Sequence, residues 1–361
     1  MRLRWLILLV SVAVVAAACG GGGTVAAKHK KLPPTTVTTA GPPVAPLTGL
    51  PDNAAQALTR PALSIKIENT PEARPQTGLD VADVVYEEIT EGNITRFIAV
   101  YNSTIPPIAG PVRSGRAMDP DILIPLGGIF AYSGGIQQTV DAISRTPGVN
   151  VIVDTGSDPA LFRDHTKSAP HNLYAHADQL LARGGKPVPP SPLFHYLQQG
   201  AQFAGDGVKQ FSISYDTLYR PTYTYDPASN TWKRSIGGTA FMDTDGQQVA
   251  PTNVIVQFVG CCLNSPEGAK DVTVGSGDIT VFSSGRMTKG TWRRSSNTQP
   301  IQYFDSNGSP LQLTPGRTWV EFFPVTGEAL GVFGVTPDPT RTIPVTTPTT
   351  APTTTTTKKK R

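Results

Sequence analysis

The chain has 361 residues, with 34 prolines, 35 glycines, three cysteines and a net charge of +4. Residues 52–337 hold 21 of the basic and 26 of the acidic side chains, so this body has a net charge of −5 and the positive charge lies in the termini. An acidic body argues against a basic nucleic-acid-binding surface, and no nucleic-acid partner is expected.

The first 18 residues have the pattern of a secretory signal peptide. Arg2 and Arg4 precede an uncharged stretch, residues 5–18, which ends in small residues before Cys19. As a helix this stretch would span roughly 21 Å, short of the roughly 30 Å core of a bilayer. A cysteine at this point resembles a bacterial lipobox, whose cysteine carries a diacylglyceryl group with palmitate-type chains. We therefore expect a lipoprotein anchored through Cys19 to the outer face of the cytoplasmic membrane; a plain secreted protein is the alternative.

Both ends of the mature chain are expected to be linkers. Residues 19–45 are rich in Gly, Pro and Thr, which predicts a flexible tether. Its lysines, Lys28, Lys30 and Lys31, are placed to contact anionic headgroups, or are simply solvated. Residues 336–361 form a Thr/Pro-rich tail with a basic end and are expected to be disordered.

Residues 46–200 are expected to form a mixed α/β domain. The alternation of residues 62–68 predicts a strand, and residues 91–94 predict a hairpin turn between two strands. Further along, short helices and buried strands alternate, which predicts a sheet with helices packed on it. In chain order, the expected elements are strands 62–68, 84–90 and 95–101, helix 119–126, strand 129–133, helix 137–143 and strand 149–153.

Residues 206–335 are expected to form a β-rich domain, after a linker at about 200–209. Nine apolar or alternating runs are separated by turn signals such as Asp245-Gly246 and Asn307-Gly308. The whole chain is thus predicted to be α+β, with a mixed α/β amino-terminal domain and a β-rich carboxy-terminal domain. The runs are 211–215, 221–225, 232–234, 253–259, 271–274, 279–282, 286–293, 301–304 and 319–324.

Several motifs together resemble the YerB-like bacterial lipoproteins, the domain-of-unknown-function family 3048. The resemblance covers residues 46–335 and implies the lipoprotein topology, an α/β domain followed by a β-rich one, and no established activity. The motifs of the first block are PLTGLP at 46–51, the run at 73–97, GPVRSGR at 110–116 and APHNLY at 169–174. Those of the second are NVIVQF from Asn253, GSGDITVFSSGR from Gly275, GTWRRSS from Gly290 and LTPGRTWV from Leu313.

The densest group of polar residues is the turn at residues 110–116. Arg113 and Arg116 flank Ser114 and Gly115, and two guanidinium groups at this spacing can converge on one carboxylate or phosphate. The turn therefore predicts an anion-binding site. The alternative is that the arginines form ion pairs with the acidic side chains of the preceding hairpin, Glu87, Glu88 and Glu91. Glu87 and Glu88 are neighbours on a strand, so their side chains are expected on opposite faces.

His171 and Asn172 are further candidates for this ligand site, together with Glu87 and Glu91. His171 could act as a general base or as a hydrogen-bond donor beside the arginines, or could hold its own loop. The spacing of the nearby histidines matches no zinc motif, so neither a metal nor a cofactor is expected. A triad built on Ser114 lacks the GxSxG elbow, so no catalytic residue is assigned.

Cys261 and Cys262 are adjacent at the end of an apolar run. A strained disulfide between them, two free thiols and links to other chains all stay open, and the CxxC spacing of a redox pair is absent.

These patterns favour a membrane-anchored binding or scaffolding module for an envelope protein or an anionic wall component. The alternative is a hydrolase or transferase acting on an envelope polymer, with His171 and a hairpin carboxylate as acid and base. A solvent-open cleft lined by the arginines and His171 would favour the enzyme, and arginines engaged in ion pairs would disfavour it.

Overall fold

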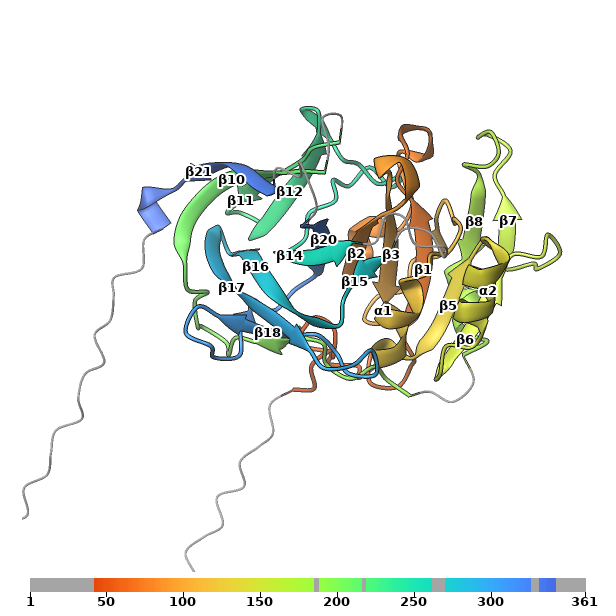
Figure 1. Ribbon diagram of the computed structural model, residues 1–361, viewed down its shortest axis with the longest axis horizontal. Helices are drawn as coiled ribbons and strands as arrows, with labels where there is room; N and C mark the ends of the chain where they lie inside the picture. Colours follow the sequence, from red (N-terminus) through yellow and green to blue (C-terminus); the bar gives the residue numbers. More distant parts are fainter. Residues whose placement is uncertain (1–41, 185–187, 216–218, 262–269, 326–330, 342–361) are drawn as a thin grey trace, which may run out of the picture. The chain divides into compact units, whose positions relative to one another are not determined.

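The computed structural model describes residues 42–184, 188–215, 219–261, 270–325 and 331–341 (Figure 1). The predicted signal peptide, Cys19, the three lysines of the tether and the tail beyond residue 341 lie outside these ranges. Within them, no helix has the length and apolar character needed to cross a membrane.

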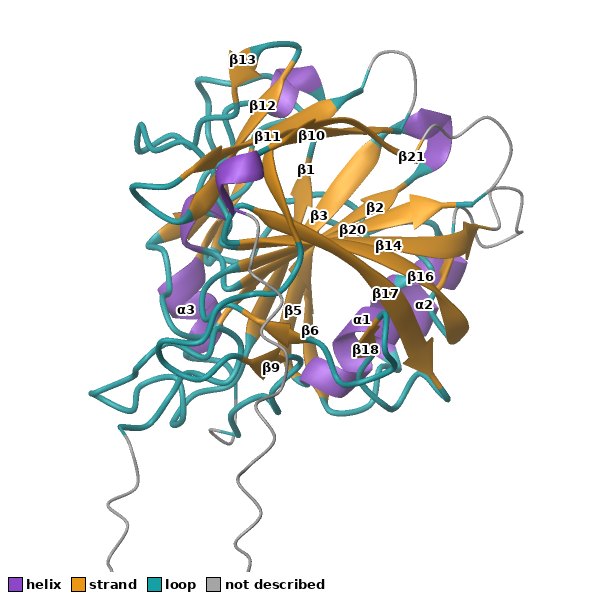
Figure 2. Ribbon diagram, turned by 90° about the vertical axis from the view of Figure 1, so that its left-hand side faces the viewer, coloured by secondary structure: helices purple, strands orange, loops and turns teal. Residues whose placement is uncertain are grey.

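One mixed sheet of 16 strands runs through both blocks of the sequence. Its main path is β13-β12-β11-β10-β17-β16-β14-β20-β2-β3-β1-β5-β6, and Figure 2 shows the strands fanning from β1 to β17 with the usual twist. The blocks meet where β2 (Val84–Ile89) pairs in parallel with β20 (Thr318–Pro324), in a register that places Glu87 beside Glu321.

The remaining strands of the first block are β1 (Leu63–Glu68), β3 (Thr95–Tyr101), β4 (Ile108–Ala109), β5 (Gly128–Tyr132), β6 (Val149–Val153), β7 (Leu161–Arg163), β8 (Leu173–His176) and β9 (His195–Tyr196). Those of the second block are β10 (Asp206–Ser214), β11 (Pro221–Asp226), β12 (Thr231–Ile236), β13 (Thr239–Ala240), β14 (Asn253–Cys261), β15 (Asp271–Val272), β16 (Gly275–Ser283), β17 (Arg286–Arg294), β18 (Gln302–Asp305), β19 (Gln312–Leu313) and β21 (Gly331–Pro337). Four 3-10 turns, η1 to η4, occupy Pro71–Ala73, Leu79–Val81, Glu91–Asn93 and Pro339–Arg341.

The predicted α+β class is wrong, because the protein is mostly β, with 43% of residues in strands and 11% in helices. The two helices expected in the first block do form, as α1 (Asp119–Leu126) and α2 (Gln137–Ser144), and α3 (Ala177–Leu181) follows. Eight residues or fewer are too short to make a helical layer over the sheet, and α1 and α2 lie beside β5 and β6 (Figure 1). The free edge of β2 is covered by a strand of the second block instead of by a helix.

Both faces of the sheet are buried in apolar clusters. Phe97 and Trp319 belong to one cluster, and the next residues along their strands, Ile98 and Val320, belong to the other. This is the period-two alternation of a strand. Each large apolar side chain buried in this way stabilises the fold by about 1.5–3 kcal/mol.

Most strands around the centre of the sheet run in one direction. β2, β14 and β20 are mutually parallel along their ladder, and so are β1, β5 and β6, while β3 is antiparallel to both β1 and β2. The carboxyl ends of these six strands therefore lie along the same edge of the sheet. In open sheets with parallel strands, ligands commonly bind at that edge.

Candidate functional site

The turn at residues 110–116 crosses this carboxyl edge. Arg113 donates its backbone N–H to Lys66 O at 2.9 Å, and its carbonyl accepts from Ser133 N at 3.0 Å, so the turn is fixed to the ends of β1 and β5. Gly115 donates to Gly134 O at 2.9 Å. A Cβ on Gly115 would lie 2.4 Å from Ile143, so glycine is needed for this close approach.

Three guanidinium groups meet at the turn, and we call Arg96, Arg113 and Arg116 the arginine cluster. Arg96 comes from the start of β3, and its Nη1 donates to Ser114 O at 2.7 Å. Arg116 Nη1 lies 3.4 Å from the same oxygen. Ser114 thus contributes its carbonyl group, which holds two arginines side by side.

Each of the two predicted arginines is paired with a carboxylate. Arg113 Nε donates to Glu68 Oε1 at 2.9 Å, and Arg116 Nη2 lies 2.6 Å from Glu91 Oε2. Glu68 is almost completely buried, whereas the Glu91 side chain is 53% exposed and its pair with Arg116 is open to solvent. The ion-pair alternative is therefore found for Glu91, and Glu68 is a partner that the sequence did not suggest.

Arg96 differs from the other two, because the Ser114 carbonyl is the only hydrogen-bond acceptor that it reaches among the described residues. Burial, followed by repulsion from Arg116 and Arg113, lowers the pKa of Arg96 to about 9. Arg113 and Arg116 are each paired with a carboxylate, whereas Arg96 has no carboxylate at hydrogen-bond distance among the described residues. An added anion would relieve the repulsion and use the remaining donors of Arg96.

A buried group of charged side chains, Lys66, Glu88 and Asp119, lies next to the arginine cluster. Lys66, fully buried on β1, contacts Glu88, and its Nζ lies 2.7 Å from Asp119 Oδ1. Burial lowers the pKa of Lys66 to about 8. The second oxygen of Asp119 accepts from the backbone N–H of Arg116 at 2.8 Å, which ties the turn to the first residue of α1.

His171 lies at the cluster, and Asn172 lies behind it. His171 Nδ1 is 3.0 Å from Glu68 Oε1, the oxygen that Arg113 also binds. Asn172 is buried and donates to the carbonyl groups of Asp164 and Lys167, so it holds the loop that carries His171.

Glu87 lies away from the cluster, on the face of β2 opposite Glu88, as the strand alternation predicted. It is fully buried and accepts hydrogen bonds from Arg234 Nη2 at 2.7 Å and Tyr219 Oη at 2.6 Å. Burial and the neighbouring Glu87 raise the pKa of Glu321 well above its usual range. The structure thus places Glu91 and Glu87 in two separate environments.

Two other groups bear on metal and thiol chemistry. The carboxylates of Asp80, Asp243 and Asp245 lie within 4.8 Å of one another, and burial and mutual repulsion raise the pKa of Asp80 to about 6. Cys261 ends β14 and lies opposite the buried Asp271 of β15, whose pKa burial raises to about 8. Cys262 lies outside the described residues, so the disulfide stays a prediction.

The sequence identified Arg113, Arg116 and His171, and the structure brings them together. The sequence did not single out Arg96 and Glu68, because they lie near the ends of the predicted strands 95–101 and 62–68 and look like ordinary strand residues. Only strand pairing could have identified them, because Glu68 and Arg96 lie opposite each other in the β1–β3 ladder, at the carboxyl end of β1.

The fold and this edge define a class of β-rich protein in which two sequence blocks share one sheet. Two family models, described as the N-terminal and C-terminal domains of "Protein of unknown function (DUF3048)", match residues 47–187 and 211–320. The chain belongs to this family, which confirms the predicted resemblance. The predicted domain limits, 46–200 and 206–335, stay predictions.

A relative and a solved structure resemble the chain. "Putative lipoprotein YerB" of Bacillus subtilis (strain 168) is 28% identical over 300 residues, which cover 78% of this chain and 86% of that protein. The crystal structure of YerB protein from Bacillus subtilis has a TM-score of 0.69 at 26% identity and covers 78% of this chain and 97% of that one. The sequence similarity and the fold therefore agree over the same share of the chain.

Proposed function

We propose that this protein is an extracytoplasmic lipoprotein whose arginine cluster binds an anionic group, a carboxylate or a phosphate, of an envelope protein or wall polymer. The observation that carries the proposal is Arg96, a partly buried guanidinium group with donors left over, between two other arginines. A guanidinium group with open donors is a strong binder of either anion.

The arrangement favours binding over catalysis. His171 faces Glu68, which Arg113 also holds, and Arg116 is paired with Glu91. These pairs fix the arginines at the edge of the sheet and leave the hydrolase or transferase alternative with no specific observation in its favour.

Binding is tested with inorganic phosphate and acetate as probes, titrated by calorimetry. The variant Arg96→Gln should weaken binding by at least about tenfold, because a hydrogen bond to a charged group contributes roughly 1.5–3 kcal/mol. Arg293→Gln is the matched control, since Arg293 is exposed on β17, and four strands of the sheet separate β17 from β3. Equal affinity of the two folded variants would contradict the proposal.

The anchor is supported by the signal-peptide pattern, by Cys19 and by the name of the Bacillus relative. Cys19→Ala should move the protein from the membrane fraction to the medium. Full retention in the membrane would point to an uncleaved signal as the anchor.

A further inference from the structure

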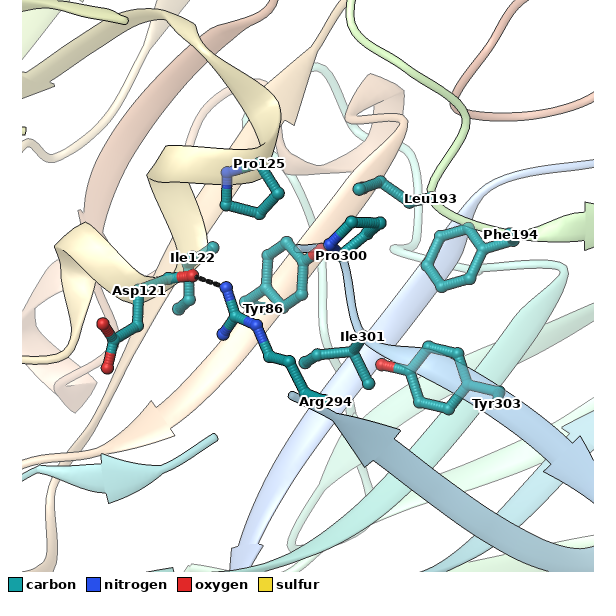
Figure 3. Close-up of a pocket in the computed structure, with 10 residues that line it drawn as sticks. All are labelled: Tyr86, Asp121, Ile122, Pro125, Leu193, Phe194, Arg294, Pro300, Ile301 and Tyr303. Carbon is teal, nitrogen blue, oxygen red and sulfur yellow. Dashed lines mark hydrogen bonds between the residues drawn. The ribbon is translucent and has the colours of Figure 1, made fainter. Parts of the chain in front are cut away.

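A second site lies between two extended segments of the chain, residues 192–195 and 300–303. They enclose an apolar cleft of about 370 Å³, lined chiefly by Pro192, Leu193, Phe194, Pro300, Ile301 and Tyr303. A smaller hollow shares five of these residues and extends the cleft to Tyr86 and to Pro125 of α1 (Figure 3). The volume of the cleft, about 370 Å³, is at the lower end of the range of ligand sites, whereas the hollow, at about 20 Å³, has room for a single water-sized group.

The charged side chains that line the deep end of the cleft have partners within the chain. Asp121 Oδ1 accepts from Asn297 Nδ2 at 3.2 Å, and Asp121 Oδ2 lies 3.7 Å from Lys270 Nζ at that end. Arg294 lines it, but Nε of this residue donates to Gln299 O and its two Nη atoms donate to Thr273 Oγ1 and to the carbonyl groups of Asp121 and Asn297. Figure 3 shows the hydrogen bond that joins the guanidinium group of Arg294 to the carbonyl group of Asp121 in α1. The occupant is therefore uncharged, unlike the ligand of the arginine cluster.

The deep end does offer a hydroxyl group. Tyr86 lines the hollow, and its Oη has no hydrogen-bond partner among the described residues. Tyr303, by contrast, donates to Gln257 at 2.9 Å. A ligand that brings a carbonyl group and no N–H matches this end, because it can accept from Tyr86 without burying an unpaired donor.

The chain itself shows how this surface binds a peptide. Tyr303, Phe194 and Tyr196 form a row of rings, with centroids 5.9 Å and 6.4 Å apart. At the far end of the row, Tyr196 packs directly on Gly49 and donates to Leu47 O at 2.5 Å. Tyr196 thus holds the proline-containing segment 43–51 in two ways: its ring packs on the backbone at Gly49, and its hydroxyl group donates to the carbonyl group of Leu47.

We propose that the open end of the row binds an uncharged, proline-containing segment of a partner protein. Proline supplies an apolar ring and a carbonyl group but no N–H, which fits a deep end that has the Tyr86 hydroxyl and whose charged side chains are already paired. The rings of Phe194 and Tyr303 form the floor, as aromatic-lined grooves do for other proline-rich ligands. The site continues a surface that already holds such a segment, and it is separate from the anion site.

The probe is a blocked peptide with the sequence of residues 43–51, PVAPLTGLP, and its control has alanine at the three prolines. Amide chemical shifts of the full mature protein are followed during titration with each peptide. The proline peptide should shift residues 193–195 and 301–303, and the alanine peptide should bind at least about tenfold more weakly.

Variants test the location. Leu193→Glu and Ile301→Glu place a charge on partly exposed rim positions and should each weaken binding at least about tenfold. Val188→Glu is the control, at a side chain that is 65% exposed and outside the cleft. Shifts confined to other residues, equal binding of both peptides, or cleft shifts caused by dodecanoyl glycerol but not by the peptide would overturn the proposal.

Discussion

Replacing Glu321 by glutamine is expected to stabilise the protein at neutral pH and to destabilise it slightly in acid. Glu321 is fully buried on β20, and its pKa is raised well above the usual value by burial and then by Glu87. In the folded protein its carboxyl group is therefore protonated and hydrogen-bonded to Glu87. An amide can donate the same hydrogen bond without taking up a proton.

The magnitude follows from the unfolded chain, in which this carboxyl group titrates near 4.5. Its contribution to stability is fully present below that pH and is lost as the pH rises, by about 1.4 kcal/mol per unit up to the folded pKa. Tyr215 donates to Glu321 Oε2 at 2.7 Å, and loss of that acceptor costs about 1 kcal/mol. We expect a net loss of about 1 kcal/mol at pH 4 and a net gain at neutral pH, because the first pH unit above 4.5 already offsets that loss.

Urea unfolding followed by tryptophan fluorescence, at several pH values between about 4 and 8, measures the difference. Asp278→Asn is the control, because Asp278 is exposed on β16 and should leave the pH profile unchanged. Parallel profiles for Glu321→Gln and the wild type would refute the protonated state of Glu321.

Two further predictions concern the support of the site and of the sheet. Lys66→Met should lower the free energy of unfolding by about 3–5 kcal/mol in urea, because it leaves two buried carboxylates uncompensated; an unchanged midpoint would contradict a buried ion pair. Gly128→Ala should cost more than about 2 kcal/mol in the same assay, since its φ is +78° and a Cβ would lie 2.2 Å from Ala62 O. Gly246→Ala, at φ +87° with nothing within 4 Å, should cost clearly less, and equal losses would refute the role of the close approach.

Local patterns predicted the strands well but not their neighbours. The strands expected at 62–68, 84–90 and 95–101 form within a residue or two of those limits, because alternation and a turn signal are local features. The partner of β2 on its other edge is β20, more than 200 residues away, and no local pattern encodes that pairing. The predicted fold class was wrong because the helices are few and short and because strands of both blocks join one large sheet.

In the candidate site, too, the residues within a local motif were predicted and those brought in by strand pairing were not. Arg113 and Arg116 were predicted because a Gly-Pro turn and two arginines stand within one short motif. Arg96 was not, because a single arginine among the apolar residues of a strand is typical of a solvated position. Only the β1–β3 pairing, which sets Arg96 beside Glu68 at the edge, gives it a place in the cluster.

Helix α1 was predicted correctly from its local sequence, but the local sequence does not account for its stability. It has eight residues, an internal proline and no side-chain cap, and such a helix is unstable alone. Its first turn is held by distant groups: Asp119 by Lys66 of β1, and the Asp121 carbonyl by Arg294 of β17. Asp119 also holds the backbone of Arg116, so the shape of the turn at residues 110–116 depends on the buried lysine. The same helix therefore supports the arginine cluster at its first residue and lines the apolar cleft at Pro125.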